Sequence, residues 1–136
     1  MYQVLLRSVL ETAAPVFAGG LTKTNIRDFE NVQKSAFKII LRGNYINYEN
    51  ALELLEQDTL EMRRNTISYK FAKKNIHHPK MRHLFRKKIS ARTRSKSKFI
   101  EPTFKTNRGQ KGPVSYLIRL LNNDLRYKKR KAGSKL

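Results

Sequence analysis

The chain has 136 residues, 39% of them apolar, which suffices for one small domain with a single core. It contains no cysteine, which excludes a disulfide framework and a thiolate zinc site. Arg7 and Glu11 interrupt the N-terminal apolar stretch before it reaches the length of a secretory signal, and no other stretch is apolar enough to span a bilayer. We therefore expect an intracellular protein.

The formal net charge is +20, and it is distributed very unevenly. Residues 1–65 contain eight Lys and Arg and eight Asp and Glu, whereas residues 66–136 contain 22 Lys and Arg and two Asp and Glu. A field of this sign and density attracts polyanions through phosphate contacts and counterion release. The distribution therefore predicts nucleic acid as the partner, with neither a membrane nor a small-molecule substrate.

The first apolar stretch predicts one helix. Leucine and valine side chains within residues 2–12 recur at helical spacing on one side. Pro15 predicts the end of this helix, because proline lacks a backbone N–H and clashes with the preceding turn. A loop through Gly19 and Gly20 is expected to follow.

Three further helices are marked by capping residues. Apolar residues recur at intervals of three and four after Thr24, with Thr22 or Thr24 as N-cap and Gly43 as C-cap. Asn47 precedes a short amphipathic stretch, and the Asp-x-x-Glu pattern at Asp58 is typical of a capping box. Four helices with short connections predict an all-α fold, a small helical bundle over residues 1–75.

The remainder of the chain is predicted to form two basic segments. Residues 76–111 form a linker region, in which the run from Arg86 to Lys98 has too few apolar residues to offset its ordering entropy and is expected to be flexible without ligand. Residues 112–136 begin with a short helix after Gly112-Pro113 and end in a basic tail. We thus expect a helical bundle followed by a basic, partly flexible C-terminal half.

Two N-terminal sequence blocks carry a family resemblance. The first reads Arg7-Ser-Val-Leu-Glu11, then Ala14-Pro15-Val16-Phe17 and Leu21-Thr22-Lys23. The second reads Phe29-Glu30-Asn-Val32-Gln33-Lys34-x-Ala36-Phe-Lys-Ile39-Ile40. Together they resemble the Ile-Arg-x-x-Leu-Glu-Tyr-Ala-x-Pro-Val-Trp-x-x-x-Leu-Thr block, and the Leu-Glu-x-Val-Gln-Lys-Arg-Ala-x-Arg-Ile-Ile helix after it, of jockey-like, LINE-type non-LTR retrotransposon reverse transcriptases.

Downstream blocks are similar to successive parts of the same family, so that the resemblance covers about residues 2–122. Thr12 and Phe17 depart from the usual Tyr and Trp. Both changes remove a large amphipathic aromatic ring, which affects the packing after the first helix. The downstream blocks are Tyr48-x-x-Ala51-Leu52, Leu60-x-x-Arg63-Arg64, Phe71-Ala72-Lys73-Lys74 and Pro113-x-x-Tyr116-Leu117-x-x-Leu120-Leu121-Asn122.

The resemblance implies the thumb and the segment after it, a part of the polymerase that follows the catalytic palm. Family polymerases bind two metal ions through a Tyr/Phe-Ala-Asp-Asp turn, because two-metal phosphoryl chemistry needs clustered carboxylates. The aspartates here are Asp28, Asp58 and Asp124, which are far apart in the sequence. We therefore expect no enzyme activity from this chain on its own and no cofactor.

A stripe of polar and cationic residues on the predicted second helix is a candidate contact for a phosphate backbone. Arg27, Asn31, Lys34, Lys38 and Arg42 lie opposite its apolar face at 100° per residue. The alternative is an ordinary solvated face, in which Glu30 pairs with Lys34 four residues later. Most such stripes are only solvated faces, and the support for the first interpretation comes from the resemblance, because thumbs hold the primer-template duplex.

The basic runs in the C-terminal half are stronger candidates for binding nucleic acid. Aromatic residues lie between them and could stack on unpaired bases, namely Phe85, Phe99, Phe104 and Tyr127. The alternative is a solubilising or nuclear-import sequence, which is compatible with binding. The candidate binding residues are Arg86, Lys87, Lys88, Arg92, Arg94, Lys96, Lys98, Lys128, Lys129, Arg130 and Lys131.

Arg64 lies among apolar residues of its predicted helix. A buried guanidinium requires a carboxylate, and Glu11 and Glu30 are the candidates for a structural ion pair. His77, His78 and His83 could converge on a metal, but without cysteine or a nearby acidic ligand we expect no metal site.

Two other classes of function fit parts of the sequence. A free-standing basic RNA-binding or ribosome-associated protein would have the same composition, and the ordered family blocks argue against it. A peripheral membrane protein fits less well, because the basic half lacks the amphipathic pattern of an interfacial helix. We therefore expect a binding module for template RNA, an RNA-DNA hybrid or target DNA.

Overall fold

The computed structural model describes residues 3–89 and 98–133, with side chains for residues 5–89 and 98–123. Throughout these residues the chain forms helices and loops, and its one β feature is an isolated antiparallel bridge between Lys87 and Phe99. The predicted all-α class is confirmed. In chain order the elements are η1 (Gln3–Arg7, a π-helix), α1 (Ser8–Glu11), α2 (Ala14–Phe17), η2 (Ala18–Gly20), α3 (Lys23–Leu41), η3 (Arg42–Asn44), α4 (Tyr48–Leu54), α5 (Leu60–Asn75), η4 (Arg82–Leu84), α6 (Asn107–Gln110) and α7 (Pro113–Gly133).

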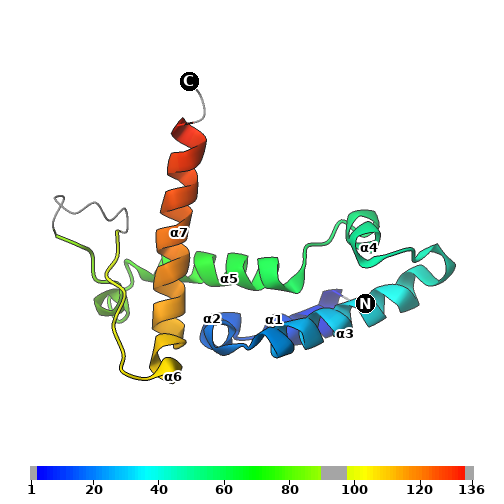
Figure 1. Cartoon of the computed structure of the whole chain (residues 1–136), viewed down its shortest axis with the longest axis horizontal. Coiled ribbons are helices and arrows are strands. Elements are labelled where there is room, and N and C mark those ends of the chain that lie inside the picture. The colour runs from blue at the N-terminus through cyan, green and yellow to red at the C-terminus, as the bar shows by residue number, and fades with distance from the viewer. Residues whose placement is uncertain (1–2, 90–97, 134–136) are drawn as a thin grey trace.

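Helix α5 is shared by the two halves of the molecule (Figure 1). Helices α1, α2 and α3 pack against it, and α4 joins α3 to its N-terminal end. Helix α7 crosses α5 nearer its other end, and residues 76–89 lie on the side of α7 opposite to α3 and α4. The two halves of different charge therefore meet along one helix.

Short polar side chains start the longer helices by accepting a backbone N–H of the first turn. The caps are Thr22 for α3, at 3.2 Å from the amide of Asn25, and Asn47 for α4, at 2.7 Å from the amide of Asn50. The sequence left Thr22 and Thr24 as alternatives for the cap of α3, and the structure selects Thr22; Asn47 was expected only to precede α4, and it caps that helix. For α5 the cap is Thr59 rather than Asp58.

The carboxylate expected to complete the cap of α5 comes from a distant residue. Glu30 on α3 accepts the backbone N–H of Glu61 at 2.9 Å, and also binds the hydroxyl of Tyr48. A carboxylate at this position is favourable, because unpaired N–H groups and the helix dipole concentrate positive charge at a helix N-terminus. The capping box predicted at Asp58 was wrong, because Thr59 is the N-cap and Glu30 of α3 accepts the amide of Glu61.

The predicted loop after Pro15 is helical. The first helical stretch ends at Glu11 as expected, but α2 then begins at Ala14 and η2 continues to Gly20. Proline is tolerated in the first turn of a helix, where its missing N–H has no intrahelical acceptor. At the end of α3, Arg42 rather than Gly43 adopts a positive φ, of 46°.

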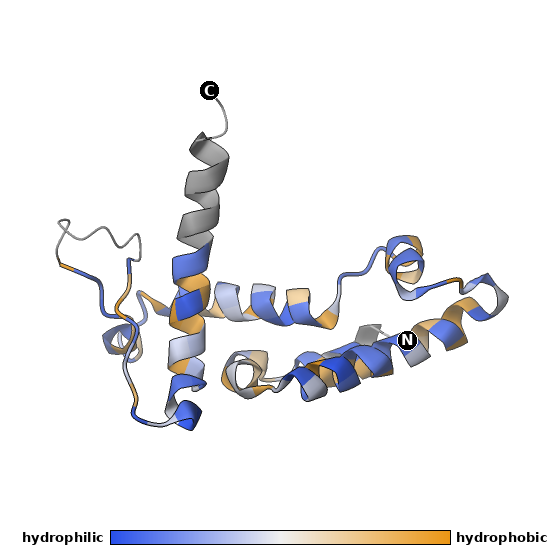
Figure 2. Ribbon diagram, viewed as in Figure 1, coloured by the Kyte–Doolittle hydropathy of each residue, from blue (hydrophilic) through white to orange (hydrophobic). Residues whose placement is uncertain are grey.

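The buried apolar cluster lies where α7 crosses α5. It consists of Ala72, Phe85, Phe99, Leu117, Ile118 and Leu121. Figure 2 shows hydrophobic residues on α7 where it passes α5. The cluster therefore draws on all three segments that the sequence distinguishes, 1–75, 76–111 and 112–136, and α7 is longer than the short helix expected there.

Small residues allow the close approach of η2 to the start of α7. A Cβ atom at Gly19 would lie 2.6 Å from the Cβ of Tyr116 and 2.8 Å from the carbonyl oxygen of Lys111. At Gly20, the next residue, an added Cβ would meet nothing within 4 Å. The two adjacent glycines therefore have different roles.

We predict that Gly19→Ala lowers the free energy of unfolding by about 1–3 kcal/mol, because the methyl group forces η2 away from α7. Gly20→Ala is the matched control and should change stability by less than about 1 kcal/mol. Urea denaturation followed by circular dichroism measures both. Equal effects of the two substitutions would contradict the close approach at Gly19.

Candidate nucleic-acid interface

The C-terminal half displays its cations on the surface. The described residues 66–89 and 98–123 contain thirteen Lys and Arg, all exposed, and one acidic residue, Glu101. With one carboxylate among them, these cations leave a large excess of positive charge. They are Lys70, Lys73, Lys74, Lys80, Arg82, Arg86, Lys87, Lys88, Lys98, Lys105, Arg108, Lys111 and Arg119.

Backbone hydrogen bonds join the two ends of the basic run. The amide of Lys88 donates to the carbonyl oxygen of Lys98 at 3.0 Å, and the amide of Ile100 donates to that of Arg86 at 2.8 Å. The predicted site residues Arg86, Lys87, Lys88 and Lys98 are thus brought together on paired, extended backbone. Arg92, Arg94 and Lys96 lie outside the described residues, and the flexibility expected of this run stays a prediction.

Asn122 on α7 holds this pair of segments against the core. Its side chain is buried, and its Oδ1 accepts the backbone N–H groups of Lys98 and Phe99, each at 3.1 Å. Its Nδ2 donates to the carbonyl oxygen of Phe99, also at 3.1 Å. One amide thereby fixes the backbone that carries Lys98.

Two of the aromatic residues proposed to stack on bases are core residues. Phe85 and Phe99 are each only 4% exposed and belong to the buried cluster at the α5–α7 crossing. They were wrong as stacking candidates because they cover the apolar face of α7. Phe104 is exposed, and the side chain of Tyr127 lies outside the described part of the chain.

Three lysines of α5 that were not predicted as site residues add to the exposed cations of the C-terminal half. Lys70, Lys73 and Lys74 are exposed on the last turns of the helix. They were assigned to the neutral bundle because the helix was treated as one unit. The signal that could have identified them is the complete lack of acidic residues from residue 62 to residue 100.

The cationic stripe on α3 has a different environment. The ammonium group of Lys34 lies 5.0 Å from the ring centre of Tyr48, and that of Lys38 lies 5.6 Å from the ring centre of Tyr45. Each lysine thus has a cation–π partner. Arg27 and Arg42 are exposed. A role of this stripe in binding stays a prediction.

The basic tail forms part of a helix. Lys128, Lys129, Arg130 and Lys131 lie within the last turns of α7, Pro113–Gly133. Their side chains are outside the described part of the structure, so their role in binding also stays a prediction.

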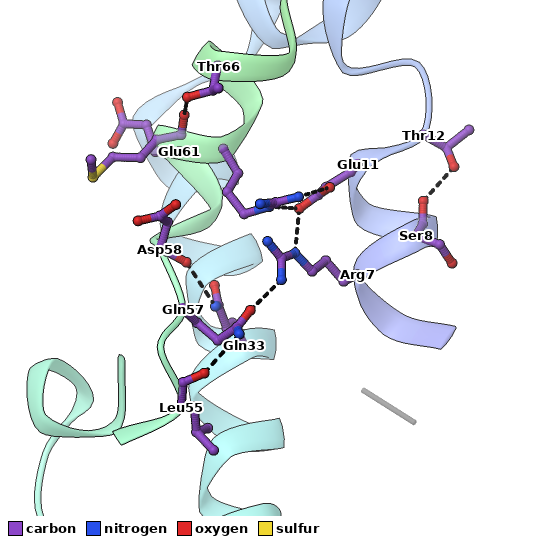
Figure 3. A network of polar contacts seen from close by, with 12 residues as sticks. Arg7, Ser8, Glu11, Thr12, Gln33, Leu55, Gln57, Asp58, Glu61 and Thr66 are labelled. Carbon is purple, nitrogen blue, oxygen red and sulfur yellow. Dashed lines mark hydrogen bonds and ion pairs between the residues drawn. The ribbon is translucent and has the colours of Figure 1, made fainter. Parts of the chain in front are cut away.

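The predicted partner of Glu11 was wrong by one residue. Glu11 binds Arg63 in a two-point contact, with the second bond, from Nη2 to Oε2, at 3.0 Å, and it also accepts from Arg7 at 2.9 Å (Figure 3). Arg64, the predicted partner, is buried at 2% exposure and projects elsewhere. Neighbouring residues on a helix are about 100° apart, so only one of the two arginines can face α1.

Arg64 lies over an aromatic ring instead of beside a carboxylate. Its guanidinium carbon is 5.3 Å from the ring centre of Phe29, and its Nη1 and Nη2 have no hydrogen-bond partner among the described residues. Glu30, the second predicted partner, is engaged at the N-terminus of α5. The expected ion pair of Arg64 is therefore not formed.

The environment of Glu11 makes its ion pairs dependent on pH. Burial by itself raises the pKa of Glu11, but hydrogen bonds from Arg63 and Arg7 outweigh this effect and bring the pKa below its ordinary value. Because the carboxyl group titrates at lower pH in the folded chain than in the unfolded chain, the ion pairs stabilise the fold at neutral pH. That contribution is lost as the pH falls through the lowered pKa.

The remaining features give no further site. Within residues 3–89 and 98–133 no group of three or more His, Cys, Asp or Glu side chains is arranged to hold a metal ion. None of the helices described here is long and apolar enough to cross a membrane. Comparisons of the chain with protein-family models, curated proteins and solved structures find no match.

We predict opposite outcomes for the two neighbouring arginines. Arg63→Met should lower the free energy of unfolding by about 1–2 kcal/mol at neutral pH, because Glu11 loses its two-point partner. This destabilisation should shrink at acid pH, where Glu11 takes up a proton as the pH falls through its lowered pKa.

Arg64→Met is the control, because methionine keeps the apolar stem and removes a buried charge whose Nη1 and Nη2 have no acceptor within the described part of the chain. It should leave stability unchanged or raise it by about 1 kcal/mol. Urea denaturation at both pH values tests the pair of variants. A larger destabilisation by Arg64→Met than by Arg63→Met would show that Arg64 has an acceptor in solution.

A third prediction concerns the anchor of the paired basic segments. Asn122→Ala should increase hydrogen exchange at the amides of Lys98 and Phe99 by about tenfold or more, because it removes the acceptor of both amides. Exchange followed by NMR measures this, with Asn44→Ala, an exposed amide on η3, as control. Unchanged protection at both amides would exclude the anchoring role.

Proposed function

We propose that this chain binds nucleic acid through the exposed cationic surface of its C-terminal half, and that it corresponds to the thumb and post-thumb part of a LINE-type reverse transcriptase without the catalytic palm. The observation that carries the proposal is the set of thirteen exposed Lys and Arg with one carboxylate in residues 66–89 and 98–123. On this proposal template RNA, an RNA-DNA hybrid or target DNA is the ligand. Polymerisation would require the palm.

The arrangement of these cations supports binding to a polymer of phosphates. Lys70, Lys73 and Lys74 extend along α5, and Arg86, Lys88 and Lys98 follow on backbone tied to α7. Phosphate contacts contribute most to affinity when their positions are held, because binding then costs less side-chain and backbone entropy. The core at the α5–α7 crossing holds this backbone.

The family assignment is supported by where the resembling blocks lie. The second block, from Phe29 to Ile40, lies within α3. The Leu60 and Phe71 blocks lie on α5, and the Pro113 block begins α7. Each of these blocks thus lies within a single helix, as expected for a helical thumb.

The proposal is tested by binding of the full chain to labelled single-stranded RNA, DNA duplex and RNA-DNA hybrid, with anionic vesicles for comparison. Fluorescence anisotropy across a salt series gives the affinities. About six phosphate contacts would lower the affinity roughly 10³-fold between about 50 and 200 mM salt. No binding to any nucleic acid at low salt, or equal affinity for vesicles, would contradict the proposal.

Two triple variants with the same net charge show which surface binds. We predict that Lys70→Gln, Lys73→Gln and Lys74→Gln together reduce the salt slope by roughly one for each phosphate that these lysines neutralise. The matched triple on α3, Arg27→Gln, Lys34→Gln and Lys38→Gln, should reduce it less. The reverse order would assign binding to the α3 stripe.

A further inference from the structure

A cavity of about 560 Å³ lies between α7 and the segment that follows Lys98. Its size is in the range of sites for small organic groups, roughly 300–1,000 Å³. It borders the cationic surface but differs from it in chemistry, because its walls carry apolar, amide, cationic and anionic groups. The lining includes Lys88, Ile100, Glu101, Arg119, Asn122 and Asn123.

The wall of the cavity is built on buried structure. Asn122 is 7% exposed, and its amide group binds the backbone of Lys98 and Phe99 through three hydrogen bonds. Phe99 is fixed in the core. The backbone just before Ile100 and Glu101 is therefore attached to α7, and the amide of Ile100 donates to the carbonyl oxygen of Arg86 at 2.8 Å.

Glu101 is the informative residue in this wall. It is the one acidic residue between positions 62 and 123, and it lies in the cavity rather than elsewhere on the surface. Its carboxylate binds the Nε of Arg119, and both side chains are a little over 40% exposed. Arg119 also donates to the carbonyl oxygen of Gln110. A carboxylate repels a phosphate, but it accepts hydrogen bonds from amino groups.

The rest of the lining fits a flat, polar-edged ligand. Ile100 is 44% exposed and offers an apolar surface. Asn123 is exposed and carries both a donor and an acceptor. Nucleobases have apolar faces and an edge of donors and acceptors, and carboxylates accept from the exocyclic amino group of cytosine while asparagine pairs with adenine. Lys88 lies at the same cavity, where a phosphate next to the base could approach it.

We infer that this cavity accepts one unpaired nucleobase with an exocyclic amino group, from a strand whose phosphates lie on the cationic surface. The inference rests on the proposed function, because the surface must first bind the strand. Glu101 accepts from the amino group, Asn123 contacts the remaining edge, and Ile100 covers part of one face. Uracil and thymine lack an amino group and are bound less well.

The test compares strands of equal charge. Labelled oligonucleotides of about twelve nucleotides, either oligo(A), oligo(C), oligo(U) or an abasic strand, are titrated with the full chain at fixed low salt. Oligo(A) and oligo(C) should bind at least about 5-fold tighter than the abasic strand, because stacking and edge contacts add to the phosphate term. They should also bind more tightly than oligo(U).

Two variants assign the preference to the cavity. Asn123→Leu should reduce the ratio of oligo(A) to abasic affinity toward one and leave the abasic affinity unchanged, whereas Asn44→Leu, an exposed amide far from the cavity in sequence, should change neither. Glu101→Gln should reduce the preference over oligo(U). Circular dichroism verifies that each variant is folded.

Each remaining outcome overturns one of the two proposals. Equal affinity of wild type for oligo(A) and the abasic strand would overturn the base site while leaving charge-driven binding intact. An unchanged ratio of oligo(A) to abasic affinity in Asn123→Leu, together with an unchanged preference over oligo(U) in Glu101→Gln, would do the same. Absence of binding to every strand at low salt would instead overturn the proposed function and the base site with it.

Discussion

The structure depends on α5, which packs against α1, α2 and α3 and is crossed by α7 nearer its C-terminal end. Near the start of α5, Arg63 forms an ion pair with Glu11 of α1. The backbone amide of Glu61, in the first turn, donates to the carboxylate of Glu30 on α3. Towards its end, Ala72 belongs to the buried cluster that α7 completes. A helix of sixteen residues thus orients two sets of elements that otherwise have opposite chemical character, one neutral and one strongly basic.

This sharing explains how a chain with net charge +20 can hold its cations in place. Like charges repel, and a segment with few apolar residues has little to offset that repulsion. Here Phe85 and Phe99 anchor the basic segment on both sides of residues 90–97, and the amide of Asn122 binds the backbone next to Phe99. The basic segment has few apolar residues, but Phe85 and Phe99 are both buried in the cluster at the α5–α7 crossing and hold the segment there.

The sequence predicted features that depend on nearby residues and missed those that depend on distant ones. Thr22 was one of two candidate caps, and Asn47 was expected just before its helix, because a cap binds an amide only three residues away. The burial of Phe85 and Phe99 depends on Leu117 and Ile118 in a helix much later in the chain, which no local pattern reveals. The candidate site shows the same difference between local and distant information.

The excess of cations in the C-terminal half was evident from counting residues in the sequence. The cavity lined by Glu101 could not be predicted, because it forms only where residues 98–101 lie against α7.

The same separation in sequence determines the order in which parts of the fold can form during synthesis. The hydrogen bonds from Glu11 and Glu30 to α5 can form once Arg63 has been added, because both glutamates precede it. The buried cluster on the far end of α5 cannot close before Leu121 leaves the ribosome. Domains generally fold from the N-terminus during synthesis, and exposed apolar surface is then prone to aggregate. Tyr69, Ala72 and Ile76 are synthesised first among the residues of this cluster, so their apolar surface stays exposed longest before α7 packs on it.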